Sequence, residues 1–344
     1  MKRLGLFMCL SSVLLLVAWC RLQAQTITTF DVPGDVYGTY PYMIILDGTI
    51  TGEYCEATLC HGFLRSPRGV ITTFDVRGAG GSEGTIPISM SPVGTVAGYY
   101  TDQSDVHHGF LRNRRGDITT FDFPRSTSTI AYDINLEGTI AGFYLDKQGV
   151  RHGYLRYADG GFTSFNPPSG TFEPLQCAAT CLNSEGSLVG IYMDGNGLYH
   201  GFLRNRAGRI TTIDPPEAVN GTYAVSINAE GAIIGWYFDA VFVEHGYVRK
   251  SNGTFTTFDV PGAAGTEPGT INFWGAIVGD YFDPSGVYHG FLRQPGGTII
   301  TFDVPSAGID PGEGTWPYCI SALGASTGYY ADSDGNYHGF VRKP

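Results

Sequence analysis

The chain has 344 residues, a formal net charge of −11 and only 15% charged residues, together with 49 glycines, 21 tyrosines and 21 phenylalanines. This acidic balance disfavours nucleic acid and anionic membranes as partners, because their phosphate groups would be repelled. Glycine and aromatic residues that recur at regular intervals predict many short strands joined by tight turns.

The first 24 residues have the order of a secretory signal peptide. Lys2 and Arg3 precede an apolar run from Leu4 to Trp19, and the small residue Ala24 follows a short polar stretch. We therefore expect residues 1–24 to be a signal peptide and residues 25–344 to form a secreted domain, extracellular or periplasmic. The apolar run is short for a bilayer and no second one follows, so membrane insertion is not expected.

Three short blocks recur seven times in residues 25–344. In chain order within a repeat they are Gly-x-x-x-Gly-x-Tyr, His-Gly-Phe-Leu-Arg and Ile-Thr-Thr-Phe-Asp, each with small variations. The mean period is about 46 residues, the size of a four-stranded unit. Each repeat is predicted to hold an inner strand a, a strand b with the Gly and Tyr, a strand c with the His, and a strand d that ends at the Asp. Helical periodicity is absent.

The two ends of the repeat array complement each other. Residues 25–31 form a strand d with no preceding strand c, and the chain finishes on a strand c with no following strand d. The sequence therefore predicts an all-β, seven-bladed β-propeller with four-stranded blades, closed by the N-terminal strand pairing in the last blade. An open solenoid is the alternative, but solenoids usually end in atypical capping repeats.

The repeated blocks and the export signal resemble the bacterial extracellular HAF-type repeat proteins, in a variant form with Gly in the middle of the His-Gly-Phe motif. The resemblance covers the whole of residues 25–344. It implies export and a repeated fold. It implies no catalytic residues, because that family is defined by its repeats.

The motif histidine and the motif acid are separated by the same spacing in every complete copy, and a symmetric hairpin of that span places the two side chains opposite each other. We interpret them as structural hydrogen-bonded pairs. Metal ligation and catalysis are less favoured, because an active site is seldom repeated around a ring, and no catalytic residue is assigned. The expected pairs are His61–Asp75, His108–Asp122, His200–Asp214, His245–Asp259, His289–Asp303 and His338–Asp31, with Asn166 opposite His152.

Two cysteines flank the turn between strands b and c of the first repeat. Cys55 and Cys60 would occupy opposed positions of this hairpin, so a disulfide between them is expected in an exported protein. Cys177 and Cys181 follow each other along one extended segment and are not expected to pair.

The loops between strand d and the next strand a vary in length, whereas the c–d turn does not, and loops on a rigid scaffold usually carry function. Acids also concentrate on the d–a and b–c side. We therefore expect the ligand there, with carboxylates at the mouth of the central channel that bind calcium or neutral sugars and repel polyanions. The candidate ligand-binding residues are Glu83, Glu173, Glu217, Glu267 and Glu313 with the aromatic residues Phe172, Tyr223 and Trp316.

The functional expectation is a secreted, non-enzymatic binding module whose ligand is a glycan or a protein. An enzyme that acts on polysaccharide, a lyase or a hydrolase, is one alternative, and a structural component of the envelope or matrix is another. His107 is the single histidine outside the repeat pattern. Paired carboxylates with shifted pKa values in a deep pocket would favour the enzyme, whereas a shallow face lined by aromatic side chains would favour binding.

Overall fold

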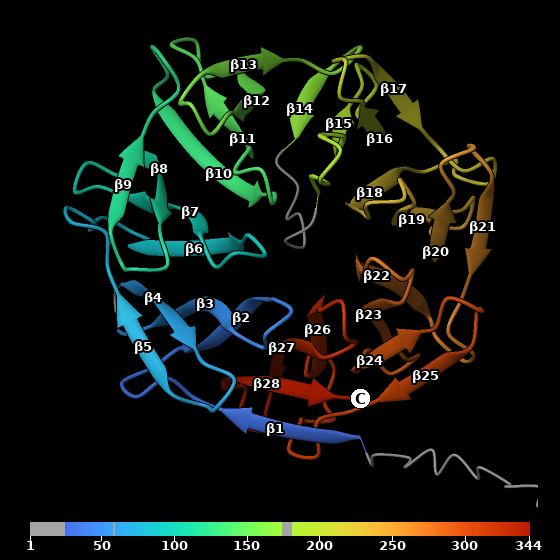
Figure 1. Cartoon of the computed structure of the whole chain (residues 1–344). Coiled ribbons are helices and arrows are strands. Elements are labelled where there is room, and N and C mark those ends of the chain that lie inside the picture. Colours follow the sequence, from blue (N-terminus) through green and yellow to red (C-terminus); the bar gives the residue numbers. More distant parts are fainter. Residues whose placement is uncertain (1–24, 58, 174–180) are drawn as a thin grey trace, which may run out of the picture.

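The computed structural model describes residues 25–57, 59–173 and 181–344, so the expected signal peptide lies outside the described residues. Every regular element in the described part of the chain is a β-strand, and none of it is a helix long and apolar enough to cross a membrane. The strands lie in groups around a central axis (Figure 1), and each group consists of four strands paired in an antiparallel manner. We call each group a blade.

Within a blade the strands run antiparallel in chain order, from strand a near the centre to strand d at the rim (Figure 1). Blades 1 to 3 contain β2 (Gly38–Ile44), β3 (Ile50–Cys55), β4 (Cys60–Arg65), β5 (Ile71–Phe74); β6 (Thr85–Met90), β7 (Val96–Thr101), β8 (His107–Arg112), β9 (Ile118–Phe121); β10 (Ser128–Ile134), β11 (Ile140–Leu145), β12 (Arg151–Arg156) and β13 (Phe162–Phe165). Blades 4 and 5 contain β14 (Thr171–Glu173), β15 (Leu188–Met193), β16 (Tyr199–Arg204), β17 (Ile210–Ile213); β18 (Thr222–Ile227), β19 (Ile233–Phe238), β20 (Glu244–Arg249) and β21 (Phe255–Phe258). Blades 6 and 7 contain β22 (Gly265–Ile271), β23 (Ile277–Phe282), β24 (Tyr288–Arg293), β25 (Ile299–Phe302); β26 (Gly314–Ile320), β27 (Ser326–Ala331), β28 (Tyr337–Lys343) and β1 (Thr26–Phe30).

Blade 7 combines both ends of the described chain. Strand β1 pairs antiparallel with β28 in a register that runs from Thr26 opposite Lys343 to Phe30 opposite Gly339. The Phe30 ring covers Gly339, which has no side chain to protect the backbone there. The first strand d of the chain thus forms the outer strand of the last blade, as the complementary ends of the sequence predict.

Adjacent blades are joined by a guanidinium group that lies over a phenylalanine ring. In six blades the motif Arg of strand c covers the Phe near the end of strand d in the preceding blade, at 4.6 to 5.1 Å from Cζ to the ring centroid: Arg65–Phe30, Arg112–Phe74, Arg156–Phe121, Arg204–Phe165, Arg293–Phe258 and Arg342–Phe302. Strand β17 ends in Ile213, so Arg249 lies instead over Phe255 of its own blade, 5.9 Å away.

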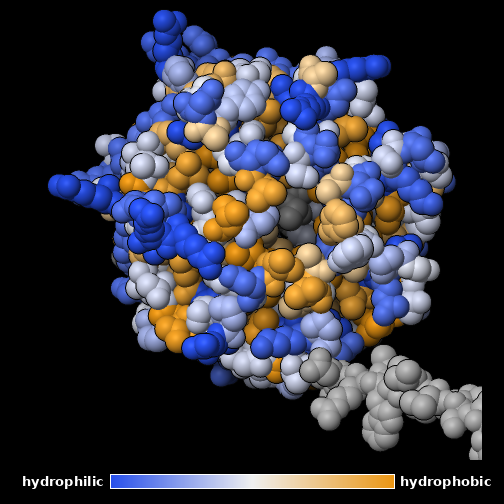
Figure 2. Space-filling view, viewed as in Figure 1, coloured by the Kyte–Doolittle hydropathy of each residue, from blue (hydrophilic) through white to orange (hydrophobic). Residues whose placement is uncertain are grey.

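On the side of the a–b turns, asparagine side chains connect one blade to the next. Asn135, Asn183, Asn228 and Asn272 each donate to a backbone carbonyl oxygen in the a–b turn of the following blade, at 3.0 to 3.3 Å. Large apolar side chains are exposed beside these turns, among them Trp274, which is 67% exposed. Figure 2 shows apolar patches around the centre of the face seen in that view.

Candidate functional site

Two variable repeat positions face each other where strand a begins and strand b ends. The partners in the register are Tyr40 with Glu53, Glu267 with Asp280, and Trp316 with Tyr329. The strand-b position is the residue between the motif Gly and the motif Tyr, and it changes chemically from blade to blade. Strand a is the innermost strand of each blade (Figure 1), so both positions lie near the centre of the molecule on the d–a and b–c side.

The larger of two adjoining cavities on this side has a volume of about 480 Å³, and we call it the tyrosine cavity. Its walls come from blades 1, 2, 3 and 7. It is lined by Tyr40, Tyr42, Glu53, Cys60, Ser82, Glu83, Ile86, Ile88, Tyr99, Tyr132, Tyr318 and Tyr329. No Lys, Arg or His is among these described lining residues, so the cavity is acidic.

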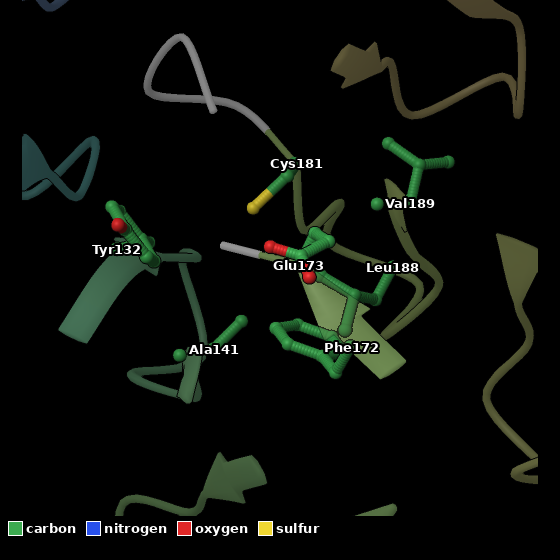
Figure 3. A pocket seen from close by; sticks show the side chains of 9 residues that line it. Tyr132, Ala141, Phe172, Glu173, Cys181, Leu188 and Val189 are labelled. Atoms are coloured by element: carbon green, nitrogen blue, oxygen red, sulfur yellow. The ribbon is translucent and has the colours of Figure 1, made fainter. Parts of the chain in front are cut away.

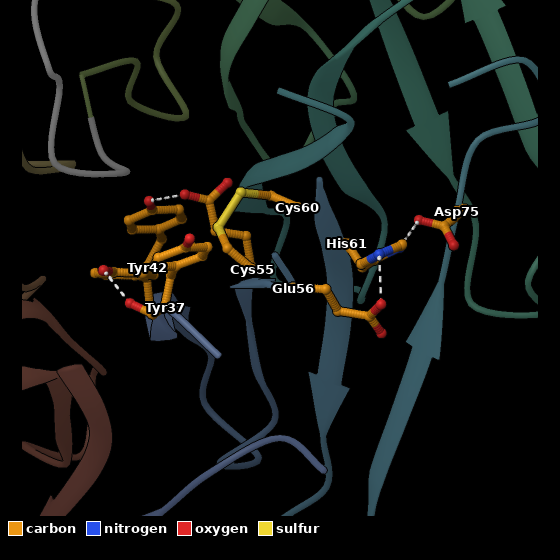
Figure 4. The surroundings of a disulfide bond; sticks show 9 residues. Tyr37, Tyr42, Cys55, Glu56, Cys60, His61 and Asp75 are labelled. Carbon is orange, nitrogen blue, oxygen red and sulfur yellow. Dashed lines mark hydrogen bonds and ion pairs between the residues drawn. A yellow bond between two sulfur atoms is a disulfide. The ribbon is translucent and has the colours of Figure 1, made fainter. Parts of the chain in front are cut away.

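Glu53 is the most shielded acid of the tyrosine cavity. The hydroxyl of Tyr42 donates to Glu53 Oε1 at 2.6 Å (Figure 4), whereas the buried Glu53 Oε2 has no hydrogen-bond partner. Burial raises the pKa of Glu53 to about 7, an effect that the hydrogen bond from Tyr42 partly opposes and the nearby Glu83 adds to. This carboxyl group therefore holds a proton in part of the molecules near neutral pH.

Glu83 has the opposite electrostatic character. Its Oε2 lies 3.4 Å from Nε2 of His107. The neighbouring His107 lowers the pKa of Glu83, against the effect of burial, and Tyr99 lowers it further. The tyrosine cavity thus contains one acid with a raised pKa and one acid with a lowered pKa.

The smaller cavity has a volume of about 220 Å³, and we call it the tryptophan cavity. It belongs to blades 5, 6 and 7 and shares Tyr318 and Tyr329 with the tyrosine cavity. It is lined by Val225, Trp236, Glu267, Pro268, Gly269, Asp280, Tyr288, Trp316, Pro317, Tyr318 and Tyr329. The described lining again includes no Lys, Arg or His.

Three carboxyl groups meet at the edge of the tryptophan cavity. Glu267 lies opposite Asp280 in the register, and Glu244 of the preceding blade forms a parallel bridge with Gly265, two residues before Glu267. Burial, the Asp280 carboxyl group and a hydrogen bond shared with Glu244 raise the pKa of Glu267. Burial and the Glu244 charge raise the pKa of Asp280.

Aromatic rings form a continuous belt through both cavities. Trp316 contacts Tyr288 and Tyr329 with ring centroids 5.1 and 5.5 Å apart. Tyr329 in turn contacts Tyr40 at 5.3 Å, and Tyr42 contacts Tyr318 at 5.2 Å. Aromatic faces of this kind bind apolar patches and cations, whereas the carboxyl groups between them accept hydrogen bonds.

Three of the residues that the sequence analysis selected line these cavities: Glu83, Glu267 and Trp316. Tyr223 lies behind the tryptophan cavity, where its ring stacks on that of Trp236 at 5.1 Å.

The remaining candidates lie elsewhere. Glu173 lines a separate small pocket (Figure 3), where it forms an ion pair with Arg151 at 3.0 Å. Phe172 is only 9% exposed and packs among other phenylalanines, so it offers little surface to a ligand. Glu313 accepts a hydrogen bond from the backbone of Asp310 in its own loop, and Glu217 is exposed. The five glutamates therefore do not form one ring.

Sequence reasoning did not select Glu53, Asp280, Trp236 or Tyr329. All four occupy the variable position between the motif Gly and the motif Tyr. This position changes from repeat to repeat inside an otherwise regular block. Its variation is the feature of the sequence that marks it as a candidate for ligand binding.

The motif histidines lie against the acids that the spacing predicts. Nδ1 of each histidine is 2.8 to 2.9 Å from the acid of strand d in the pairs His61–Asp75, His108–Asp122, His200–Asp214, His245–Asp259, His289–Asp303 and His338–Asp31. His152 is 2.6 Å from Asn166. Each Nε2 also faces an acid of the b–c turn, at 3.1 Å for His338 and Asp332. This second partner was not predicted.

Cys55 and Cys60 are joined by a disulfide beside the tyrosine cavity (Figure 4). Cys181 is buried, and Cys177 lies outside the described residues. Within the described chain, the group Glu53, Cys55 and Cys60 alone brings three candidate metal-ligand atoms within 4.8 Å of one another, and its two sulfurs are bonded to each other. Calcium binding stays a prediction.

Comparison with known proteins assigns this chain to a structural class on the basis of its fold alone. No family model and no curated protein matches the chain. Among solved structures, a catalytically inactive virginiamycin B lyase from Staphylococcus aureus with quinupristin superimposes with a TM-score of 0.61 at 15% identity, over 92% of this chain and 99% of that chain. The β-propeller domain of the Trilobed protease from Pyrococcus furiosus, with an open velcro topology, gives 0.60 at 8% identity, over 88% and 95%. The chain is a β-propeller.

Proposed function

We propose that this protein is an exported, non-enzymatic binding module that binds oligosaccharides at its central face. The observation that supports this most strongly is the belt of aromatic rings in the tyrosine and tryptophan cavities, with carboxyl groups between the rings. Aromatic faces contact the apolar faces of sugar rings, and carboxylates accept hydrogen bonds from sugar hydroxyl groups. The absence of basic residues from the described linings disfavours polyanionic glycans.

Calorimetric titration of the secreted protein with a panel of neutral and cationic oligosaccharides tests this proposal. Changing Trp316→Ala removes the ring that connects Tyr288 with Tyr329, and should weaken binding about tenfold, as loss of a central aromatic contact usually does. Trp274→Ala is the matched control, because Trp274 is exposed in an a–b turn on the other side. No binding to any member of the panel, or equal losses in both variants, would contradict the proposal.

A second candidate function, hydrolysis or elimination on a polysaccharide, is favoured by the two acids of the tyrosine cavity. The pKa of Glu53 is raised and that of Glu83 is lowered within one cavity. Such divergence is typical of an acid–base pair. Release of new sugar ends by the wild type and its loss in Glu53→Gln would establish the enzyme, whereas binding without any turnover would favour the binding module.

A further inference from the structure

The described residues that line the tryptophan cavity include acids but no cationic group. Burial, Asp280 and Glu244 raise the pKa of Glu267, burial and Glu244 raise that of Asp280, and Glu244 Oε2 is buried without a hydrogen-bond partner. The other titratable groups that face this cluster are tyrosines from four neighbouring strands: Tyr223, Tyr288, Tyr318 and Tyr329. None of these is a cation, so a positively charged ligand in the cavity would find the carboxyl groups of Glu267 and Asp280 without a cationic partner.

The arrangement suits an organic cation better than a metal ion. The three carboxyl groups do not bring their oxygens within 4.8 Å of one another, which is the convergence that a small hard ion requires. Glu267 and Asp280 border a space of about 220 Å³ with two tryptophans in its wall. Indole and phenol faces attract ammonium groups through the ring quadrupole, most strongly in a site shielded from water.

We infer that the tryptophan cavity selects a sugar bearing a primary ammonium group, so that the oligosaccharide bound at the central face is a deacetylated amino-sugar polymer. This inference rests on the function proposed above and specifies the ligand class. In the bound state the ammonium group donates hydrogen bonds to Glu267 and Asp280. Trp316 and Trp236 supply flat faces for the sugar rings and the cation.

Binding should also release protons from the protein. Burial and mutual repulsion keep part of the carboxyl cluster protonated when the cavity is free, and a cation favours the ionised carboxylates. The heat of binding should therefore depend on the ionisation enthalpy of the buffer, in the direction of proton release. A ligand that carries no charge does not require this release.

The test compares two matched ligands, a chitosan pentamer and its fully N-acetylated counterpart, titrated into the secreted protein at about pH 6, where the amine is charged. We expect the wild type to bind the amine form about tenfold more tightly, with proton release. Glu267→Gln should reduce the preference to about twofold, because it weakens binding of the amine form more than binding of the acetylated form. Glu217→Gln, an exposed acid outside both cavities, is the control and should keep the preference.

Each other outcome overturns the inference in a distinguishable way. Equal binding of the two pentamers by the wild type rejects selection for an ammonium group and leaves glycan binding intact. If neutral oligosaccharides bind and neither pentamer binds, the ligand is not an amino-sugar polymer. Pentalysine that binds as tightly as the chitosan pentamer shows that the cavity accepts any amine and rejects a glycan ligand. Failure of all oligosaccharides rejects the proposed function as well.

Discussion

At the scale of single residues, each motif histidine links two loops on the d–a and b–c side. In blade 7, Nδ1 of His338 is 2.8 Å from Asp31 and Nε2 is 3.1 Å from Asp332. Asp332 also accepts backbone hydrogen bonds from Asp334 and Asn336, and so fixes its own turn. The first partner follows from hairpin spacing alone. The second depends on the shape of a turn, which a repeat spacing does not specify.

This double contact predicts a dependence of stability on pH. Burial tends to lower the pKa of His338, but the hydrogen bonds to Asp31 and Asp332 outweigh it and raise the pKa above 6.5. When folding raises the pKa of a histidine, the resulting stability is fully present at pH values below the pKa of the unfolded state. It is lost as the pH rises through the pKa of the folded state. Asp332, whose pKa is lowered from 3.8 to about 2, adds stability above its unfolded value that is lost as pH falls toward 2.

We therefore expect His338→Gln to lower the free energy of unfolding by about 1 kcal/mol at about pH 5.5, and by less at about pH 8.5. Urea unfolding at both pH values measures this difference. In a background with Asp31→Asn and Asp332→Asn the pH-dependent part should vanish. An effect of His338→Gln that is equal at the two pH values would show that the ion pairs add nothing.

At the scale of the strands, the contact between the motif Arg and the preceding blade explains why strand d ends in an aromatic residue. Arg293 lies 4.7 Å from the centroid of Phe258, whereas Ile213 at the equivalent position leaves Arg249 to pack within its own blade. The blade 4–5 junction therefore lacks a contact that six other junctions contain. The sequence shows the Phe-to-Ile exception, but the partner of that Phe belongs to the next repeat and cannot be inferred from one hairpin.

A double-mutant cycle on Phe258→Ile and Arg293→Met should give a coupling free energy of about 0.5–1 kcal/mol, the usual strength of a partly exposed cation–π contact. The same cycle on Ile213→Ala and Arg249→Met is the control and should give a coupling near zero. Urea unfolding of the single and double variants supplies the values. Equal coupling at the two junctions would contradict a specific role for the ring.

The positions of the strands also decide which residues line the candidate site. Two of the predicted glutamates, Glu83 and Glu267, reach the cavities, because each stands where strand a enters the centre of the molecule. Glu313 occupies the same repeat position as Glu83 but bonds back to its own loop. The direction of a side chain in a loop is set by local hydrogen bonds, so the position of a glutamate in the loop does not by itself predict whether it lines a cavity. The register of strands a and b, which brings Glu53 and Asp280 into the wall, was predictable in principle.

At the scale of the whole molecule, we infer that the pairing of β1 with β28 closes the ring. The pairing extends over all five residues of β1 and adds the Phe30–Arg65 contact between blades 7 and 1. Without β1, strand β28 would present unpaired backbone groups at an open edge. The complementary ends of the sequence made this arrangement predictable, because an orphan strand c and an orphan strand d complete one blade.

A variant that begins at Val32 instead of Gln25 should lose more than about 2 kcal/mol of unfolding free energy, since it lacks a whole strand and its contacts. It should also associate through the exposed edge of β28. Urea unfolding and light scattering during size-exclusion chromatography measure the two effects against the chain that begins at Gln25. A truncated chain that stays monomeric and equally stable would show that β1 is dispensable.

The central claim is that ligands bind on the face where the aromatic belt and the carboxyl groups meet. Oxidative footprinting of the protein by mass spectrometry, with and without a saturating oligosaccharide, tests this most directly, because Trp316 and Trp274 report on opposite sides of one molecule. The account predicts that ligand protects Trp316 and Tyr329 from oxidation and leaves Trp274 unchanged. Protection of Trp274 with no change at Trp316 would contradict it and would place the binding site on the side of the a–b turns.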